Sequence, residues 1–390
     1  MGVVDPDEVT RYISSLPESN KRKELLKLFI ELPYQRVNDS PTLKHYTEWE
    51  EYDRLSLSLR AQGERIRPIL PLLKPADKYV IIVDNEVIEG NLDLSSEPYN
   101  SVISPSSEKL VALTLATAGK LKVTRGGKYF IYHVSTSPLL FSPLNVEVEA
   151  GKGEKIELFY MNRVEAGMGS LVLGARGAEG SSVKVRLVNL GNSSHFYLFS
   201  RMEIQGELEL DVFSSGTRLG HAEIKVDLGE GARSSFKARA FGVRDNKIDL
   251  KVDVNHVGPY SSSQGLLKAV AADEAYTSIR GVASISSSAP DSSTSIIGRS
   301  LLISRGAKAV VTPMLEVKTG KIREARHSAS ASKVSEDSVF YLQSRGVDRK
   351  TAEGLIIRGF LLEEGDPSEV LQVVEESLTK LGYTKVEPSV

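Results

Sequence analysis

The spacing of apolar residues divides the chain into three parts, and the first of them is helical. Asp5 followed by Pro6 predicts a helix start, because aspartate caps free backbone N–H groups and proline suits the first helical position. Apolar residues then recur at helical spacing until Pro33, at Leu25, Leu26, Phe29 and Leu32. A second helix is expected over residues 43–61, around Trp49. Residues 1–76 are therefore predicted to form an N-terminal helical region.

In the second part, from Lys78 to about Glu316, the apolar period changes to two. Apolar and charged residues alternate there as in strands with one buried face, most clearly over residues 183–187, 208–212, 222–226 and 248–254. Turn signals rich in glycine and serine separate these segments. The alternation alone fits either a β-sandwich or a solenoid of stacked coils, and the predicted β-core spans residues 77–330.

The third part, residues 331–390, returns to helical spacing. Helices are expected over 337–344, with Gly346 as a C-terminal cap, and over 351–362. A last helix is predicted to begin with Asp366 as N-cap and Pro367 in the first position. The chain is thus expected to be mainly β with flanking helices.

Composition narrows the kind of partner and location. The chain has 390 residues with a formal net charge of -2, so no strong basic surface points to nucleic acid. Its apolar runs are short and no basic, apolar leader opens the sequence, so we expect a cytoplasmic protein without membrane contact. There is no cysteine, which excludes disulfides, thiolate metal sites and cysteine nucleophiles.

Self-contained catalytic motifs are also absent from the sequence. It contains no GxxxxGK[ST], HExxH, GxSxG or GxGxxG pattern, so any ATP hydrolysis by a P-loop must come from another protein. Acidic residues alternate with lysines along the strands, as on a solvated face, instead of gathering in a groove. We therefore expect a protein that is not an enzyme.

A series of motifs between Asn255 and Phe360 identifies a family. In order they are HxGxxSxS from His256, KxVxxDxA from Lys268, LLIxxGA from Leu301, PxLEV from Pro313, a single histidine, His327, then FYLxSRG and GF. Together they resemble the SufB/SufD family of iron–sulfur cluster assembly proteins. This resemblance implies a right-handed parallel β-helix core with N-terminal and C-terminal helical subdomains.

The chain departs from the B-type pattern of this family at two places. Gly298 and Arg299 stand ahead of Leu301, where the resemblance implies a cysteine, and Ser328 follows His327 in place of a glutamate. A chain without thiolate cannot hold a cysteine-ligated cluster by itself. The chain is accordingly most like a SufD-type subunit.

The resemblance implies His327 as an interface residue and candidate iron ligand. No cofactor is expected in the isolated chain, but iron or an iron–sulfur cluster would be held transiently at the interface with a SufB-like partner. From the residues alone, His327 could equally be a hydrogen-bonded histidine at a domain junction. His256 is expected to be a buried or turn histidine at a coil corner.

The resemblance also implies a docking region for a SufC-like ABC ATPase. The residues assigned to it are Phe340, Tyr341, Leu342, Gln343, Arg345, Gly346 and Phe360. Tyr341, Gln343 and Arg345 are expected to be exposed, whereas packing of Phe340 and Leu342 on the core is the competing interpretation. The resulting hypothesis is a non-enzymatic scaffold of the SUF system that supports iron acquisition and cluster assembly. A homodimeric β-helix interaction protein and a carbohydrate-active β-helix enzyme remain the alternatives.

Overall fold

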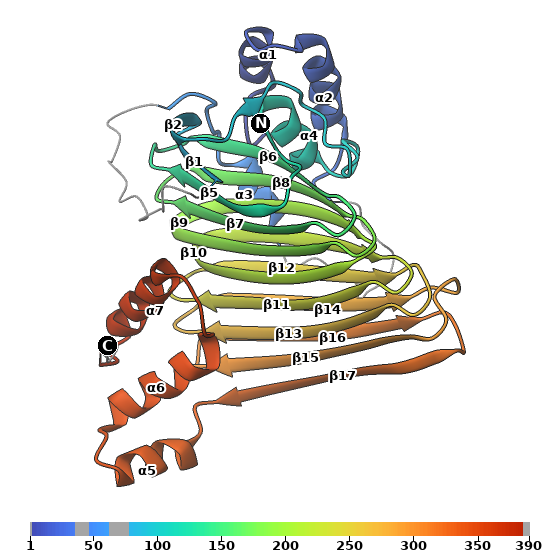
Figure 1. Cartoon of the computed structure of the whole chain (residues 1–390). Coiled ribbons are helices and arrows are strands. Elements are labelled where there is room, and N and C mark those ends of the chain that lie inside the picture. The colour runs from blue at the N-terminus through green and yellow to red at the C-terminus, as the bar shows by residue number, and fades with distance from the viewer. Residues whose placement is uncertain (1, 36–46, 62–77, 385–390) are drawn as a thin grey trace.

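Two stacks of parallel strands make up most of the molecule (Figure 1). The computed structural model describes residues 2–35, 47–61 and 78–384. The chain passes alternately from one stack to the other, and each strand pairs in parallel with the strand one coil later. About eight turns build up in this way. The predicted parallel β-helix is therefore confirmed, and a sandwich is excluded.

The two stacks share two long strands that bend from one stack into the other, β9 (Ser182–Ile204) and β10 (Glu207–Leu228). The first stack contains β1 (Lys78–Val83), β5 (Gly127–Ser135), β7 (Lys155–Val164), the first halves of β9 and β10, β11 (Arg233–Gly242), β13 (Ser262–Ala271), β15 (Ser292–Leu302) and β17 (Ile322–Lys333). The second stack contains β4 (Lys120–Val123), β6 (Phe141–Ala150), β8 (Met168–Gly177), the second halves of β9 and β10, β12 (Lys247–His256), β14 (Tyr276–Ile285) and β16 (Lys308–Val317).

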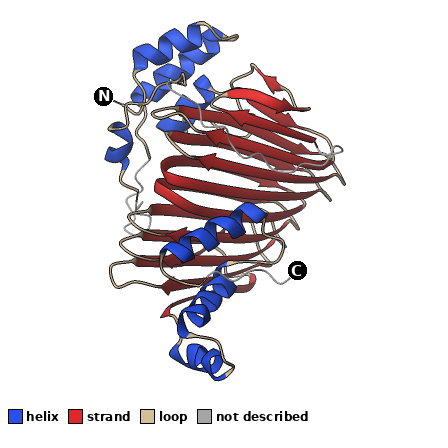
Figure 2. Ribbon diagram, turned by 90° about the vertical axis from the view of Figure 1, so that its left-hand side faces the viewer, coloured by secondary structure: helices blue, strands red, loops and turns tan. Residues whose placement is uncertain are grey.

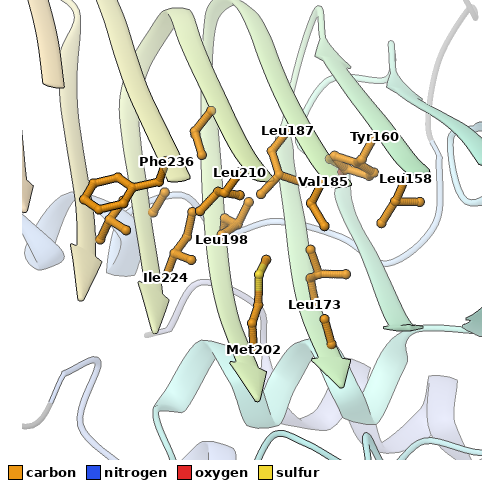
Figure 3. Close-up of a cluster of buried hydrophobic side chains, with 14 of the residues drawn as sticks. Leu158, Tyr160, Leu173, Val185, Leu187, Leu198, Met202, Leu210, Ile224 and Phe236 are labelled. Atoms are coloured by element: carbon orange, nitrogen blue, oxygen red, sulfur yellow. The ribbon is translucent and has the colours of Figure 1, made fainter. Parts of the chain in front are cut away.

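The interior between the stacks is a continuous apolar core (Figure 3). Alternate residues of each strand point inward, and because the strands are in register, equivalent side chains of successive coils lie above one another. In β10, for example, Leu208, Leu210 and Val212 are buried while Glu207 and Glu209 are exposed. The period-two pattern in the sequence therefore predicted the inward face correctly.

Glycine permits the bend at the centre of the long strands. Gly216 has a φ of 78°, and a Cβ atom there would lie 2.0 Å from the carbonyl oxygen of Gly191 on the coil before. Only glycine fits this backbone conformation at such a close approach. The two coils can therefore turn the corner in contact, without a projecting loop.

A buried histidine occupies another corner. His256 is fully buried and its ring nitrogens lie 2.8 Å from Ser261 Oγ and 2.9 Å from Ser263 Oγ. Ser261 also contacts Ser292 Oγ of the next coil. Burial lowers the pKa of His256 to about 4, so the ring is neutral. This confirms His256 as a corner histidine.

Four helices at the N-terminal side pack against the outer face of the second stack (Figures 1 and 2). They are α1 (Pro6–Ser14), α2 (Ser19–Glu31), α3 (Trp49–Asp53) and α4 (Lys109–Thr117). The Asp5 carboxylate accepts a hydrogen bond from the Asp7 N–H at 2.8 Å, as the predicted cap requires. The helix expected over 43–61 is wrong after Asp53, where the chain turns; residues 43–46 lie outside the described residues.

Helix α4 was not predicted, since the segment containing it was assigned to strands. Every residue of Leu110–Thr117 is buried, so the helix is apolar on all sides. A short run of this kind cannot be distinguished from a buried strand by periodicity. The helix packs between α2 and strands β6 and β8.

Three helices follow the last strand, α5 (Glu336–Ser344), α6 (Arg349–Leu361) and α7 (Ser368–Lys380). Helix α7 lies across the outer face of the first stack, whereas α5 and the start of α6 extend beyond β17 (Figures 1 and 2). Asp366 is not the N-cap of α7, as the sequence had suggested; Pro367 occupies that position without a side-chain cap. The Asp366 carboxylate instead contacts Arg239.

Candidate functional site at the open end of the β-helix

The two ends of the β-helix are finished differently. At the N-terminal end, short antiparallel strands cover the edges of β1 and β4, namely β2 (Glu86–Gly90) and β3 (Leu94–Ser95). Leu92 and Leu94 also pack against the interior core there. At the other end, the outer edge of β17 pairs with no strand among the described residues. Unpaired N–H and C=O groups therefore line this edge, which we call the open end.

The last strand, β17, differs in composition from the strands that it follows. Its register with β15 aligns His327 with the inward-facing Ile296, and Ala325, Ala329 and Ala331 with the other inward positions. Almost every residue of β17 is exposed. Except for His327, these inward positions of β17 carry small side chains, so another polypeptide could approach this strand closely.

Hydrogen bonding orients the His327 ring. Its Nδ1 atom lies 2.9 Å from the carbonyl oxygen of Pro313 on β16. A carbonyl can only accept, so Nδ1 carries the proton and the lone pair of the neutral ring is on Nε2. Metal-binding histidines in proteins are commonly oriented by the same Nδ1–H to carbonyl contact. The geometry thus presents Nε2 as a donor atom, which suits a borderline metal such as iron.

His327 is not part of a complete metal-binding group among the described residues. No group of three or more His, Asp or Glu side chains that could hold a metal ion occurs within residues 2–35, 47–61 and 78–384. The sequence also lacks cysteine. A metal bound by His327 would therefore take its other ligands from elsewhere, and a position at an open end makes that feasible.

The three helices that follow β17, α5 to α7 (residues 336–380), form what we call the helical arm. Its first helix, α5, exposes aromatic side chains. Phe340 is 74% exposed and Tyr341 58% exposed, and the Arg345 guanidinium lies 5.5 Å from the Tyr341 ring centre. The competing interpretation, in which Phe340 packs on the core, is wrong, because Val339 is the buried residue of α5. The expected exposure of Tyr341, Gln343 and Arg345 is confirmed.

The remaining residues assigned to ATPase docking are less uniform. Leu342 is half-buried, and Gly346, with a φ of 86°, ends α5 as the predicted C-terminal glycine. Apolar side chains on the outer face of the first stack pack with those of α6 and α7, and we call this group the outer apolar cluster. Phe360 packs partly against it, with the Lys268 ammonium 6.0 Å from its ring centre. The structure therefore brings Phe340, Tyr341, Gln343 and Arg345 together on one projecting helix and its end, but it separates Phe360 from them.

A polar groove of about 380 Å³ lies on the outer face of the first stack and extends to β17. It contains three carboxylates, each next to a cation: Glu209 with Lys184 at 2.8 Å, Glu324 with Arg326 at 2.5 Å, and Glu207 with Arg233 at 3.7 Å. Glycoside hydrolysis needs one carboxyl group that stays protonated beside one that is ionised. Carboxylates paired in this way do not provide that arrangement.

These features define a class of fold, a parallel β-helix with a projecting helical arm and a last strand whose outer edge is unpaired among the described residues. Residues 135–360 match the family model described as "SUF system FeS cluster assembly, SufBD core domain". The chain therefore belongs to the SufBD family of iron–sulfur cluster assembly proteins, and the resemblance drawn from its motifs is confirmed.

Individual relatives agree with this assignment. An iron–sulfur cluster assembly SufBD family protein of Mycobacterium tuberculosis is 31% identical over 133 residues, which cover 34% of this chain and 16% of the relative. A SufBD family protein of Staphylococcus saprophyticus is 30% identical over 136 residues, 35% of this chain and 29% of the relative. The iron–sulfur cluster assembly protein SufD of Plasmodium berghei is 27% identical over 203 residues, 50% of this chain and 14% of the relative.

The matched regions thus cover well under two thirds of these relatives. None of the helices in the described residues combines the length and apolar character that spanning a membrane requires.

Proposed function

We propose that this chain is a non-enzymatic, SufD-like scaffold subunit of an iron–sulfur cluster assembly complex. The observation that carries the proposal is the open end, where His327 stands among small side chains in a chain that lacks cysteine. Such a surface can lend one nitrogen ligand but no sulfur. The partner must therefore supply the thiolates, as a SufB-like chain would.

Pairing at the open end follows from the state of its edge. Exposed strands with unpaired backbone groups are uncommon in proteins that act alone, because they recruit further strands. The inward positions Ala325, Ala329 and Ala331 would let a partner strand lie close to β17. Iron, as the cargo of the complex, would then meet His327 Nε2 on one side and partner ligands on the other.

The helical arm is the proposed site for a SufC-like ABC ATPase. Its exposed Phe340 and Tyr341, next to Arg345, have the aromatic and arginine character of binding hot spots. ATP-dependent closure of two such ATPases, one on each scaffold chain, would pull on the arms and alter the interface near His327. The nucleotide acts in this scheme through different affinities for two states of the complex.

A second copy of the same chain is the alternative occupant of the open end. The same unpaired edge favours it, because self-pairing requires no other surface. Mass measurement of the chain with and without a SufB-like partner separates the two cases. If a heterodimer replaces the homodimer when the partner is added, the scaffold proposal is supported. If the homodimer persists unchanged, the homodimeric alternative is supported.

Reconstitution with SufB-like and SufC-like chains, followed by iron and sulfide analysis, tests the proposal. His327→Ala is expected to leave folding and complex formation intact and to reduce iron acquisition or cluster yield. Ser330→Ala, an exposed substitution on the same strand, is the matched control. Full cluster yield in His327→Ala would remove the ligand role, and a purified chain that holds iron and sulfide alone would remove the scaffold model.

Docking of the ATPase is tested on a sizing column. The double variant Tyr341→Ala and Arg345→Ala is expected to abolish co-elution with the SufC-like chain. Gln372→Ala, on the exposed side of α7, should not. Unchanged co-elution of the double variant would show that the ATPase binds elsewhere.

A further inference from the structure

A cluster of charged side chains fixes the α6–α7 connection, residues 362–367, to the outer face of the first stack. At its centre is Arg239 of β11, which is only 1% exposed. Its Nη1 and Nη2 atoms each donate to one carboxylate oxygen of Asp366 at 2.7 Å, and Nη2 also donates to Asp211 of β10 at 3.0 Å. Arg239 therefore joins the connection to two strands of the β-helix.

Glu363 forms a second half of the same cluster. Its two carboxylate oxygens accept hydrogen bonds from Lys237 at 2.9 Å and Lys268 at 2.5 Å. Burial alone would raise the pKa of Glu363, but hydrogen bonds from Lys268 and Lys237 outweigh it and lower the pKa to about 2. The whole cluster, which we call the clamp, consists of Asp211, Lys237, Arg239, Lys268, Glu363 and Asp366.

The charges of the clamp are complementary between the two parts that it joins. The strands contribute three cations and one carboxylate, and the connection contributes the two further carboxylates. Loss of Asp366 would leave Arg239 with Asp211 as its remaining carboxylate partner, and loss of Glu363 would leave the Lys268 ammonium, whose side chain is 11% exposed, without the carboxylate that it contacts. Both changes are unfavourable. The clamp therefore specifies one position of the connection on the strands.

The apolar contacts of the arm have a different role. Val370, Val374 and Leu378 of α7 are fully buried against the outer face of the first stack. Apolar burial holds surfaces together but is not directional. Hydrogen-bonded charges such as those of Arg239 and Asp366 are directional, so they determine where the arm is fixed.

The other end of the arm is attached quite differently. Helix α5 begins at Glu336, three residues after Lys333 ends β17, and only Val334 between them packs on the outer apolar cluster. Phe340 and Tyr341 of α5 are exposed, and β17 itself is exposed along its length. A displacement of α5 therefore acts on the strand that carries His327.

We propose that the clamp is the fixed pivot of the C-terminal arm, so that a protein bound to α5 moves α5 and β17 relative to a stationary α6–α7 connection. This inference rests on the ATPase docking proposed above. It assigns Arg239, Asp366 and Glu363 as positioning residues, which contact neither the ATPase nor iron. It also implies that nucleotide-driven motion is concentrated at the open end.

Paired spin labels on introduced cysteines test the pivot, because the native chain has no cysteine to interfere. One label is placed at Lys128→Cys, an exposed position of β5, and the other at Glu364→Cys in the connection or at Ser344→Cys at the end of α5. In the isolated chain, Asp366→Asn should broaden the distribution of distances between the labels at residues 128 and 364. Glu363→Gln should do so to a smaller extent, and it serves alone if Asp366→Asn does not fold.

Glu179→Gln, which removes an exposed ion pair with Lys152, is the control and should change neither distance. If the 128–364 distance distribution is as narrow in both clamp variants as in the native chain, the proposal that the clamp is a pivot is overturned. In the reconstituted complex with a non-hydrolysable ATP analogue, the 128–344 distance should shift while the 128–364 distance stays constant. Equal shifts of both distances would also overturn it.

Failure of the docking proposal looks different. If the SufC-like chain does not bind at all, docking is contradicted, while the measurements on the isolated chain still decide whether the clamp positions the connection. If the ATPase binds and the clamp variants respond to nucleotide as the native chain does, the docking proposal is supported and the proposal that the clamp is a pivot is contradicted.

Discussion

The two ends of the β-helix differ in whether their strand edges are paired. At the N-terminal end, β2 and β3 pair with the edges of β1 and β4, and Leu92 and Leu94 fill the interior. At the C-terminal end, β17 presents a free edge lined by alanine, serine and His327. The chain thus covers one end with its own strands and leaves the other end unpaired among the described residues, which supports the proposal that the open end receives a partner.

Packing of the N-terminal helices on the second stack buries ionisable side chains, whereas those of β17 at the open end are exposed. Glu108, directly before α4, accepts a hydrogen bond from the Tyr197 hydroxyl at 2.7 Å. Burial, together with the nearby Glu223 carboxylate, raises the pKa of Glu108 to about 8. Burial would also raise the pKa of Glu223, but Lys251 and Lys225 hold it well below its usual range. Glu108 is thus the protonated partner of this pair.

The largest expected effect comes from this buried carboxyl. The folded-state pKa lies above the ordinary value of 4.5, so the folded chain holds a proton that the unfolded chain lacks, and stability falls as pH rises from 4.5 through 8. Glutamine resembles the protonated carboxyl group and does not titrate. The native chain should lose on the order of 3 kcal/mol of unfolding free energy between pH 5 and 9, and Glu108→Gln should remove this loss. Urea unfolding followed by Trp49 fluorescence measures it, since Trp49 lies 6.5 Å from the Tyr197 ring. Parallel pH profiles of variant and native chain would contradict the assignment.

A matched pair of valines compares the two ends directly. Val123 ends β4 in the closed end and is fully buried, whereas Val317 ends β16 at the open end and is 41% exposed. Val123→Ala should cost about 2 kcal/mol of unfolding free energy through lost burial and a residual cavity. Val317→Ala should stay within about 0.5 kcal/mol. Equal costs in thermal or urea unfolding would mean that the open end is as tightly packed as the closed one.

A small effect on stability is also expected at His327. Its single hydrogen bond to Pro313 lies in an exposed strand, so His327→Ala should lower the unfolding free energy by less than about 1 kcal/mol. His256→Ala, which removes a buried ring bonded to two serines, should cost several times more. A His327→Ala chain as destabilised as the His256→Ala chain would point to a structural role for His327.

The sequence was informative wherever a strand has one buried and one exposed face. Leu208, Leu210 and Val212 alternate with charged residues, so the inward face of β10 could be read directly. Helix α4 could not, because a short and mostly apolar run, buried from Leu110 to Thr117, fits a buried strand as well as a buried helix. Strand β17 carries almost no large apolar residue, so its pattern is invisible to periodicity, and only the family motifs extended the core past Glu316.

The candidate site was predictable to different degrees. The motif around His327 located the histidine, but its contact with Pro313 depends on the packing of β16 against β17. The clamp was missed because its members come from four distant segments and Asp366 next to Pro367 resembles a helix cap. A charged residue on a strand such as Arg239 gives no signal in one sequence that it faces a buried carboxylate rather than solvent.

The most direct test of the open end is amide hydrogen exchange of β17 and α4, with and without a SufB-like partner. In the chain alone, the unpaired edge of β17 should exchange quickly and α4 slowly, since α4 is buried on all sides. Addition of the partner should slow exchange in β17 and leave α4 unchanged. A partner that binds while the exchange of β17 stays as fast as before would contradict the account.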